Sequence, residues 1–190
     1  MFYKIVRGFL VFVAHVLYRI QITGRENIPK EGAFLLCGNH IHAFDGAVLA
    51  VASKRPLRFL SKQEIFKNRL FGWVLKKMGA FPINRGTADM QAYRHTINSL
   101  KEGHGLLIFS QGTRMKDFEN AKSGVAVFAL KTGAPIVPVG IKGTYKFRSK
   151  LRIQIGEPIS MEEYAGQKIK TEIVDEVMGT LSDKITVLLK

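Results

Sequence analysis

Short apolar runs bounded by glycine or proline alternate along this chain with stretches of helical periodicity, and that alternation most constrains its fold. The runs that indicate buried strands cover residues 33–36, 57–60, 80–83, 105–109 and 136–141. Residues 151–155 alternate apolar and polar side chains, which favours an edge strand, and residues 20–23 are also strand-like. The helical patterns cover residues 46–53, 62–78, 89–101, 119–132 and 170–189. This order predicts a single α/β domain with a mixed, mostly parallel sheet flanked by helices.

The N-terminal segment has a different character from the rest. Its apolar run, residues 8–18, is shorter than the roughly 20 residues that a spanning helix needs. It also lacks a small-residue cleavage site, so we expect it to be retained. We therefore expect residues 1–22 to form an amphipathic helix that dips into one membrane leaflet, with Lys4, Arg7 and Arg19 at the headgroups. A helix packed on the core of the following domain, residues 23–190, is the alternative.

The charge balance indicates an anionic partner. Lys and Arg number 29 against 15 Asp and Glu, a net charge of +14. Basic residues in the run 54–77 are interleaved with bulky apolar ones such as Phe71 and Trp73, a mixture that suits the boundary between lipid headgroups and acyl chains. The sequence shows neither a basic recognition helix nor a stacking-sheet motif, so we expect a membrane and no nucleic acid. A basic nucleic-acid or membrane-binding module remains the alternative from another class.

The loop after the first buried strand carries the most informative pair, His40 and Asp45. A helix turns about 100° per residue, so residues five apart cannot cooperate on one helix. They can meet if His40 lies in the loop and Asp45 opens the next helix. A carboxylate bound to one imidazole nitrogen fixes the tautomer and makes the other nitrogen more basic, which is the arrangement of a general base. An ordinary helix cap at Asp45 is the alternative.

Other chemistries on the same residues are less well supported. A metal site on His40, His42 and Asp45 would need further ligands that the sequence does not supply, so no metal is expected. Around Ser110 the pattern has Ile108 where a nucleophile elbow requires glycine. The single cysteine, Cys37, lies in an apolar strand and is expected to be buried and structural.

Two arginines follow other predicted strands. Arg85 comes after residues 80–83, and Arg114 comes after residues 105–109. A guanidinium group beside glycine and hydroxyl-bearing residues can bind phosphate through forked and backbone donors. Because the carboxyl ends of parallel strands meet at one edge of a sheet, we expect both arginines near His40.

The order of these motifs resembles the four sequence blocks of the glycerolipid acyltransferase family, most closely the bacterial 1-acylglycerol-3-phosphate acyltransferases. The blocks are residues 39–45, 79–85, 109–114 and 134–139, and the resemblance extends over residues 24–156. It implies that His40 is the general base and Asp45 its partner. The substrate-binding residues that it implies are Asn39, Arg85, Gln111, Gly112, Thr113, Arg114, Lys122 and Pro138, the last in an acyl-binding wall.

The resemblance further implies the reaction and its place in the cell. A fatty acyl group would pass from acyl-CoA or acyl carrier protein to the free hydroxyl of 1-acylglycerol-3-phosphate (lysophosphatidate), giving phosphatidate for phospholipid synthesis. No cofactor is expected, and the enzyme would lie at the cytoplasmic face of the cell membrane, peripheral or monotopic. Glycerol-3-phosphate and other lysophospholipids are alternative acceptors, and a lipid hydrolase that uses water is an enzymatic alternative.

The third block departs from the family pattern. Ser110 and Gln111 stand where the family usually has proline and glutamate. Glutamine retains the size and one acceptor but removes a negative charge. We therefore expect altered phosphate affinity or acceptor preference, with activity retained because His40 and Asp45 are present.

Overall fold

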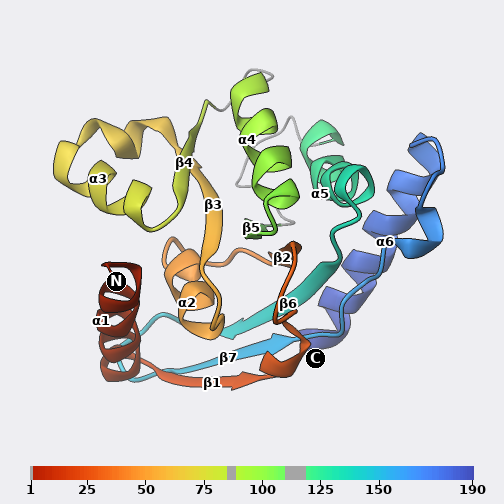
Figure 1. Cartoon of the computed structure of the whole chain (residues 1–190). Coiled ribbons are helices and arrows are strands. Elements are labelled where there is room, and N and C mark those ends of the chain that lie inside the picture. The colour runs from red at the N-terminus through yellow and green to blue at the C-terminus, as the bar shows by residue number, and fades with distance from the viewer. Residues whose placement is uncertain (1, 85–88, 110–118) are drawn as a thin grey trace.

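The strands form one seven-stranded sheet in the order β1-β7-β6-β2-β5-β3-β4 (Figure 1). The computed structural model describes residues 2–84, 89–109 and 119–190, with the backbone alone for residues 119–123. Neighbouring strands are parallel except β6 and β7, which are antiparallel. The predicted mixed, mostly parallel sheet is confirmed. The strands are β1 (Arg19–Thr23), β2 (Phe34–Gly38), β3 (Leu57–Lys62), β4 (Ala80–Ile83), β5 (Gly105–Phe109), β6 (Ile136–Gly143) and β7 (Lys150–Ile155).

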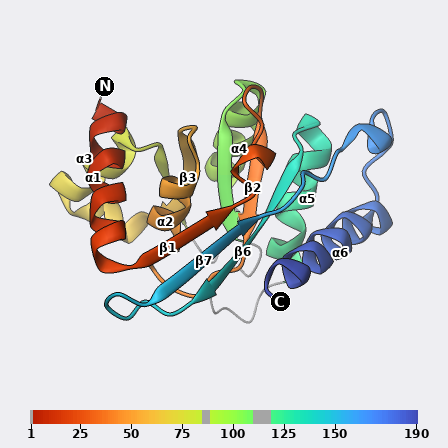
Figure 2. The same ribbon diagram turned by 90° about the horizontal axis from the view of Figure 1, so that it is seen from below.

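Helices cover both faces of the sheet (Figures 1 and 2). One face packs against α2, and the other packs against α4, α5 and α6. In the described part of the chain the α-helices are α1 (Phe2–Leu17), α2 (Asp45–Ala52), α3 (Arg69–Lys77), α4 (Met90–Lys101), α5 (Glu119–Thr132) and α6 (Thr171–Leu188). Short 3-10 helices occur at Arg25–Asn27, Gln63–Lys67 and Glu162–Tyr164.

Strand β2 lies at the centre of the core. Its side chains are buried on both faces, with Phe34 and Leu36 in one apolar cluster and Leu35 and Cys37 in the other. A continuous apolar sequence is typical of a parallel strand covered on both faces. Burial raises the pKa of the Cys37 thiol to about 12, so this residue is a structural part of the core.

Strand β7 was expected at an edge of the sheet, and that expectation is wrong. It lies between β1 and β6, and the sheet ends at β1 and β4. Its residues alternate between exposed and buried, and the buried ones, Leu151, Ile153 and Ile155, all join the cluster around α2. A central strand with one uncovered face produces the same alternation as an edge strand, so the pattern alone could not separate them.

The helix expected over residues 62–78 is divided in two. A 3-10 helix, Gln63–Lys67, precedes α3, and the side chain of Asn68 accepts a hydrogen bond of 3.0 Å from the backbone N–H of Phe71. Asparagine is a strongly preferred N-cap because its side chain satisfies an amide that the first helical turn leaves unpaired. The cap therefore starts a new helix at this point.

Helix α1 is fixed on one side and uncovered on the other. Arg7 donates hydrogen bonds to the backbone carbonyls of Ala50, Val51 and Ser53 at the C-terminal end of α2. The last carbonyls of a helix lack partners within it, which explains why Arg7 turns inward and not toward headgroups. The opposite face exposes a stripe of apolar side chains, namely Ile5, Phe9, Phe12 and Val16. The helix ends at Leu17, so the expected boundary at residue 22 falls inside β1.

Helix length also bears on how the chain meets a membrane. Within the described ranges, none of the helices combines the length and the apolar character that crossing a bilayer requires. The expectation that the N-terminal run is too short to span agrees with this finding.

Gly24 links β1 to the rest of the sheet in a conformation that requires glycine. Its φ is 75°, and a Cβ there would lie 1.9 Å from the backbone carbonyl oxygen of Ile155. We expect Gly24→Ala to lower the free energy of unfolding by about 3 kcal/mol, because left-handed strain adds to overlap with backbone. Denaturant unfolding followed by circular dichroism measures the change.

Gly32→Ala is the matched control for this substitution. Gly32 has a similar φ of 71°, but a Cβ there would have nothing within 4 Å. It should therefore show the left-handed penalty alone, about 1 kcal/mol. Equal destabilisation by the two substitutions would contradict the assigned contact with Ile155.

Candidate functional site

The loop that follows β2 leaves the sheet at the carboxyl ends of its central parallel strands, where ligands of such sheets collect. Asn39 fixes the start of this loop. Its side-chain amide donates to the carbonyl oxygen of Ile141 at 2.9 Å, and its side-chain oxygen accepts from the N–H of Ile141 at 2.7 Å. The residue is only 4% exposed. These contacts connect the loop to β6, so Asn39, expected to contact substrate, has a structural contact here.

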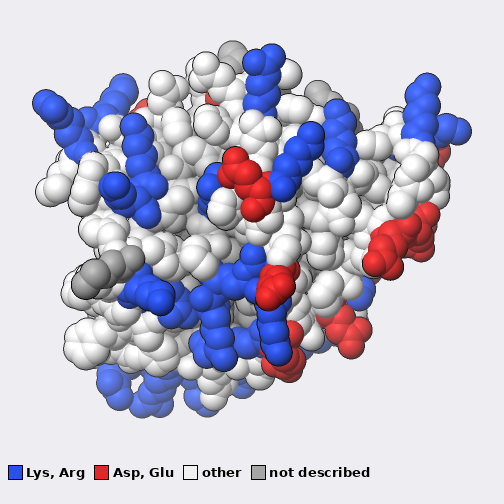
Figure 3. Space-filling view, viewed as in Figure 1, with Lys and Arg blue, Asp and Glu red and all other residues white. Residues whose placement is uncertain are grey.

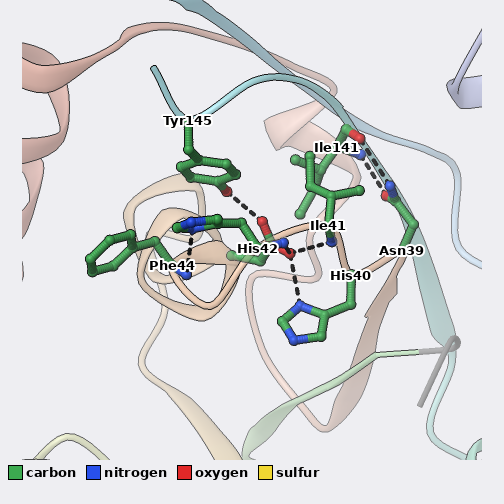
Figure 4. A network of polar contacts seen from close by, with 8 residues as sticks. Asn39, His40, Ile41, His42, Phe44, Ile141 and Tyr145 are labelled. Carbon is green, nitrogen blue, oxygen red and sulfur yellow. Dashed lines mark hydrogen bonds and ion pairs between the residues drawn. The ribbon is translucent and has the colours of Figure 1, made fainter. Parts of the chain in front are cut away.

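His40 and Asp45 come together as the spacing predicted (Figure 4). The Nδ1 atom of His40 lies 2.7 Å from Oδ2 of Asp45, and the carboxylate is fully buried. The same oxygen accepts hydrogen bonds from the backbone N–H groups of Ile41, at 2.7 Å, and His42, at 2.8 Å. Asp45 is the first residue of α2, yet its carboxylate binds the preceding loop and not the first turn of its own helix. The helix-cap alternative is therefore wrong.

The ring of His40 is held from two sides. Asp45 binds one edge, and the ring stacks on Phe109 with centroids 4.3 Å apart and planes 23° apart. Phe109 is the last residue of β5 and lies opposite Gly38 in the sheet register, which brings it to the same loop. The second ring nitrogen, Nε2, points away from the carboxylate (Figure 4), and the side chain is 22% exposed. The arrangement presents one nitrogen to an incoming proton donor.

A residue that sequence reasoning missed completes the network. Tyr145, between β6 and β7, donates a hydrogen bond from its hydroxyl to Oδ1 of Asp45. Burial, and then the bond to Asp45, raises the pKa of Tyr145 far above its usual range, so the hydroxyl stays protonated. It lies 100 positions from Asp45 in a basic segment without a motif, so the sequence contained no signal for this contact.

Among the remaining expected site residues, the structure describes the side chain of Pro138 alone. Arg85, Gln111, Gly112, Thr113 and Arg114 lie outside the described residues, and Lys122 belongs to α5 where only the backbone is described. Pro138 is buried in β6 opposite Cys37. Its pyrrolidine ring packs against Gly156, where an added Cβ would lie 3.0 Å from the ring. Its place in an acyl-binding wall stays a prediction.

Lys and Arg side chains are unevenly distributed over the surface. In the view of Figure 3, Lys and Arg side chains predominate over the side that carries α1 and α3, whereas acidic side chains gather mainly toward α6. The sequence shows the same division, because residues 157–190 contain seven of the 15 acidic residues. In the part of the chain that the structure describes, no three His, Cys, Asp or Glu side chains are grouped as metal ligands would be.

Comparisons with known proteins agree with the sequence resemblance. A family model described as Acyltransferase matches residues 19–142. The chain is 27% identical to the 1-acyl-sn-glycerol-3-phosphate acyltransferase of Bacillus subtilis, over 96% of this chain and 98% of that protein. It is 30% identical to the protein of the same name from Borreliella burgdorferi, over 86% of this chain and 72% of the relative.

A solved structure has the same fold. It is the crystal structure of the 1-acyl-sn-glycerophosphate acyltransferase PlsC from Thermotoga maritima, with a TM-score of 0.72 and 24% sequence identity. The match covers 98% of this chain and 80% of that one.

Proposed function

Because this chain belongs to the acyltransferase family, with the 1-acyl-sn-glycerol-3-phosphate acyltransferases, we propose that it moves a fatty acyl group from a thioester to lysophosphatidate. The product is phosphatidate, and the reaction serves phospholipid synthesis. The acyl donor is acyl-CoA or acyl carrier protein, and the proposed reaction needs no metal or organic cofactor. The observation that carries the proposal is the buried Asp45 carboxylate, which holds His40 with Nε2 outward at the carboxyl ends of the strands.

The proposed chemistry follows from that geometry. Nε2 of His40 removes the proton from the free hydroxyl of the acceptor as its oxygen attacks the thioester carbonyl carbon. Asp45 stabilises the imidazolium that forms, since its carboxylate accepts from Nδ1. The carbon–sulfur bond then breaks, and the thiolate takes the proton back from His40. A new ester and a free thiol are the balanced products.

The surroundings of His40 suit a lipid acceptor. Ile41 and Phe44, on the same loop, are exposed apolar residues. An exposed apolar group beside a polar reactive one matches an amphipathic substrate that reaches the site from a membrane surface. By family resemblance, Arg85 and Arg114 bind the phosphate of this substrate.

Purified protein with lysophosphatidate and acyl-CoA tests the proposal. We expect thiol release with one phosphatidate formed per thiol. Parallel reactions with glycerol-3-phosphate, other lysophospholipids and acyl carrier protein identify the preferred acceptor and donor. Free fatty acid without an acylated lipid would overturn acyl transfer in favour of hydrolysis. Salt-sensitive binding to DNA in preference to anionic vesicles would favour the nucleic-acid alternative.

The proposed location is the cytoplasmic face of the cell membrane, through peripheral or monotopic contact. The apolar stripe of α1 lies near further exposed apolar side chains on α3, and Phe2 contacts Trp73 with ring centroids 5.1 Å apart. Exposed lysines and arginines surround both helices (Figure 3). An apolar surface bordered by cations fits the interface of an anionic bilayer.

Phe12→Ser tests this surface. Phe12 is 68% exposed, so the substitution leaves the core intact. The substitution should remove about half the free energy of transferring a phenyl group from water into the membrane. Binding to vesicles with anionic lipid, measured by sedimentation, should therefore weaken about tenfold. Val187→Ser, at a similarly exposed apolar position on α6, is the control and should retain binding within about twofold. Equal binding by Phe12→Ser and the unmodified protein would exclude α1 from the membrane contact.

A further inference from the structure

The two oxygens of the Asp45 carboxylate have different partners. Oδ2 accepts from His40 and from two backbone amides, whereas Oδ1 accepts from the hydroxyl of Tyr145. The carboxylate is fully buried, so solvent does not replace a donor that is lost. A buried charged acceptor without its donor is costly and tends to rotate or recruit another partner. The orientation of Asp45 therefore depends on donors at both oxygens.

The ring of Tyr145 is held so that its hydroxyl faces Asp45. It stacks on His42 with centroids 4.3 Å apart and planes 19° apart, and it meets the edge of Tyr18 at 5.3 Å. The segment that carries it is fixed at its far end, because the N–H of Arg148 donates to the carbonyl of Leu17 at 2.6 Å. Figure 4 shows the hydroxyl directed into the network from the side opposite His40.

We propose that Tyr145 is a positioning residue for acyl transfer, which holds the Asp45 carboxylate in the orientation that receives Nδ1–H of His40. Tyr145 does not touch the reacting atoms and acts through Asp45. With Oδ1 held by the hydroxyl, Oδ2 stays directed at His40 and Nε2 stays the unprotonated nitrogen. The expected effect on kcat rests on the proposed function. The orientation and tautomer of the His40 imidazole can be observed without any substrate.

Tyr145→Phe isolates the hydroxyl because the ring and its stacking are retained. We expect kcat for phosphatidate formation to fall about 20-fold, since one hydrogen bond to a charged group is lost. The KM for lysophosphatidate should change less than about twofold, because no substrate contact is removed. A purely packing role predicts no change in kcat for this variant, and an unchanged kcat would overturn the proposal.

Tyr164→Phe is the matched control. The Tyr164 hydroxyl also donates to a carboxylate, that of Glu176 in α6 at 3.2 Å, but this hydrogen bond is exposed to solvent. It should retain kcat within about twofold, because solvent replaces an exposed hydrogen bond. A loss in Tyr164→Phe as large as in Tyr145→Phe would mean that the effect does not arise at Asp45, and would also overturn the proposal.

A double-mutant cycle with Asp45→Asn tests the route of the effect. If Tyr145 acts through Asp45, adding Tyr145→Phe to Asp45→Asn should lower kcat by less than about twofold further. A full further 20-fold loss would show an independent role for Tyr145 and overturn the proposal.

Nitrogen-15 NMR of the His40 ring, without substrate, separates this inference from the proposed function. In the unmodified protein the neutral ring should carry its proton on Nδ1, and Tyr145→Phe should show a mixture of the two tautomers. Identical spectra for the two proteins would refute positioning even if acyl transfer is observed. A tautomer change in a protein that fails to acylate any acceptor would leave the positioning role standing and reject the proposed function.

Discussion

Replacement of His40 by alanine is expected to lower kcat for acyl transfer about 10³-fold, the typical contribution of a positioned general base. The reason is geometric. His40 presents Nε2 outward while Asp45 and Phe109 hold the ring, so the substitution removes the nitrogen that would accept the proton. The residual rate should come from binding the two substrates together. Thiol release from acyl-CoA in the presence of lysophosphatidate, with lipid analysis of the product, measures the effect.

His95→Ala controls for the loss of a histidine as such. His95 is exposed on α4, and its ring contacts Phe81 of β4. His95→Ala should retain the rate of acyl transfer within about twofold. His40→Ala should still fold and bind vesicles. Turnover by His40→Ala equal to that of the unmodified protein would eliminate His40 as the base.

Asp45→Asn is expected to lower kcat by a similar factor, about 10³-fold, with little change in size at the site. Asparagine has one acceptor oxygen and one donor nitrogen in place of two acceptors. If its oxygen binds the amides of Ile41 and His42, its nitrogen faces Tyr145, and the balance of donors in the network is lost. In the opposite orientation its nitrogen faces His40 and forces the ring into the wrong tautomer. Both orientations remove the charge that stabilises the imidazolium.

The same variant distinguishes catalysis from folding. Steady-state kinetics and thermal unfolding should be measured together, with Asp183→Asn in α6 as a control on an exposed carboxylate. A network that serves folding alone would lower the melting temperature and leave kcat per folded molecule unchanged. That result would remove Asp45 from the proposed mechanism, whereas a large loss of kcat in a folded protein supports it.

Much of the sheet could be predicted because its signals are local. The apolar run of β2 and the run 105–109 of β5 match the observed strands closely, since each is a short apolar segment bounded by chain breakers. The class of the fold follows from their alternation with helices. Asn68 shows the limit, because a single capping side chain outweighed a helical pattern that extended on both sides of it.

The order of the strands could not be read in the same way. The alternating pattern of β7 reports that one face is covered, and it contains no information on which strands lie beside it. Pairing depends on how β1 and β6 enter the sheet, which is decided by packing between segments far apart in the chain. The same holds for α1, because only the tertiary structure shows that Arg7 binds the end of α2.

The sequence alone was enough to predict that an imidazole and a carboxylate can meet, because His40 follows the end of a strand and Asp45, five residues later, opens a helix. Only the tertiary structure decided what surrounds them. Phe109 reaches the pair from the end of β5, and Tyr145 reaches it from the loop between β6 and β7. Contacts between residues so far apart in the chain produce no periodic sequence pattern. Local backbone geometry depends on residues a few positions apart, so it can be predicted from the sequence pattern. Long-range contacts depend on the packing of the whole sheet.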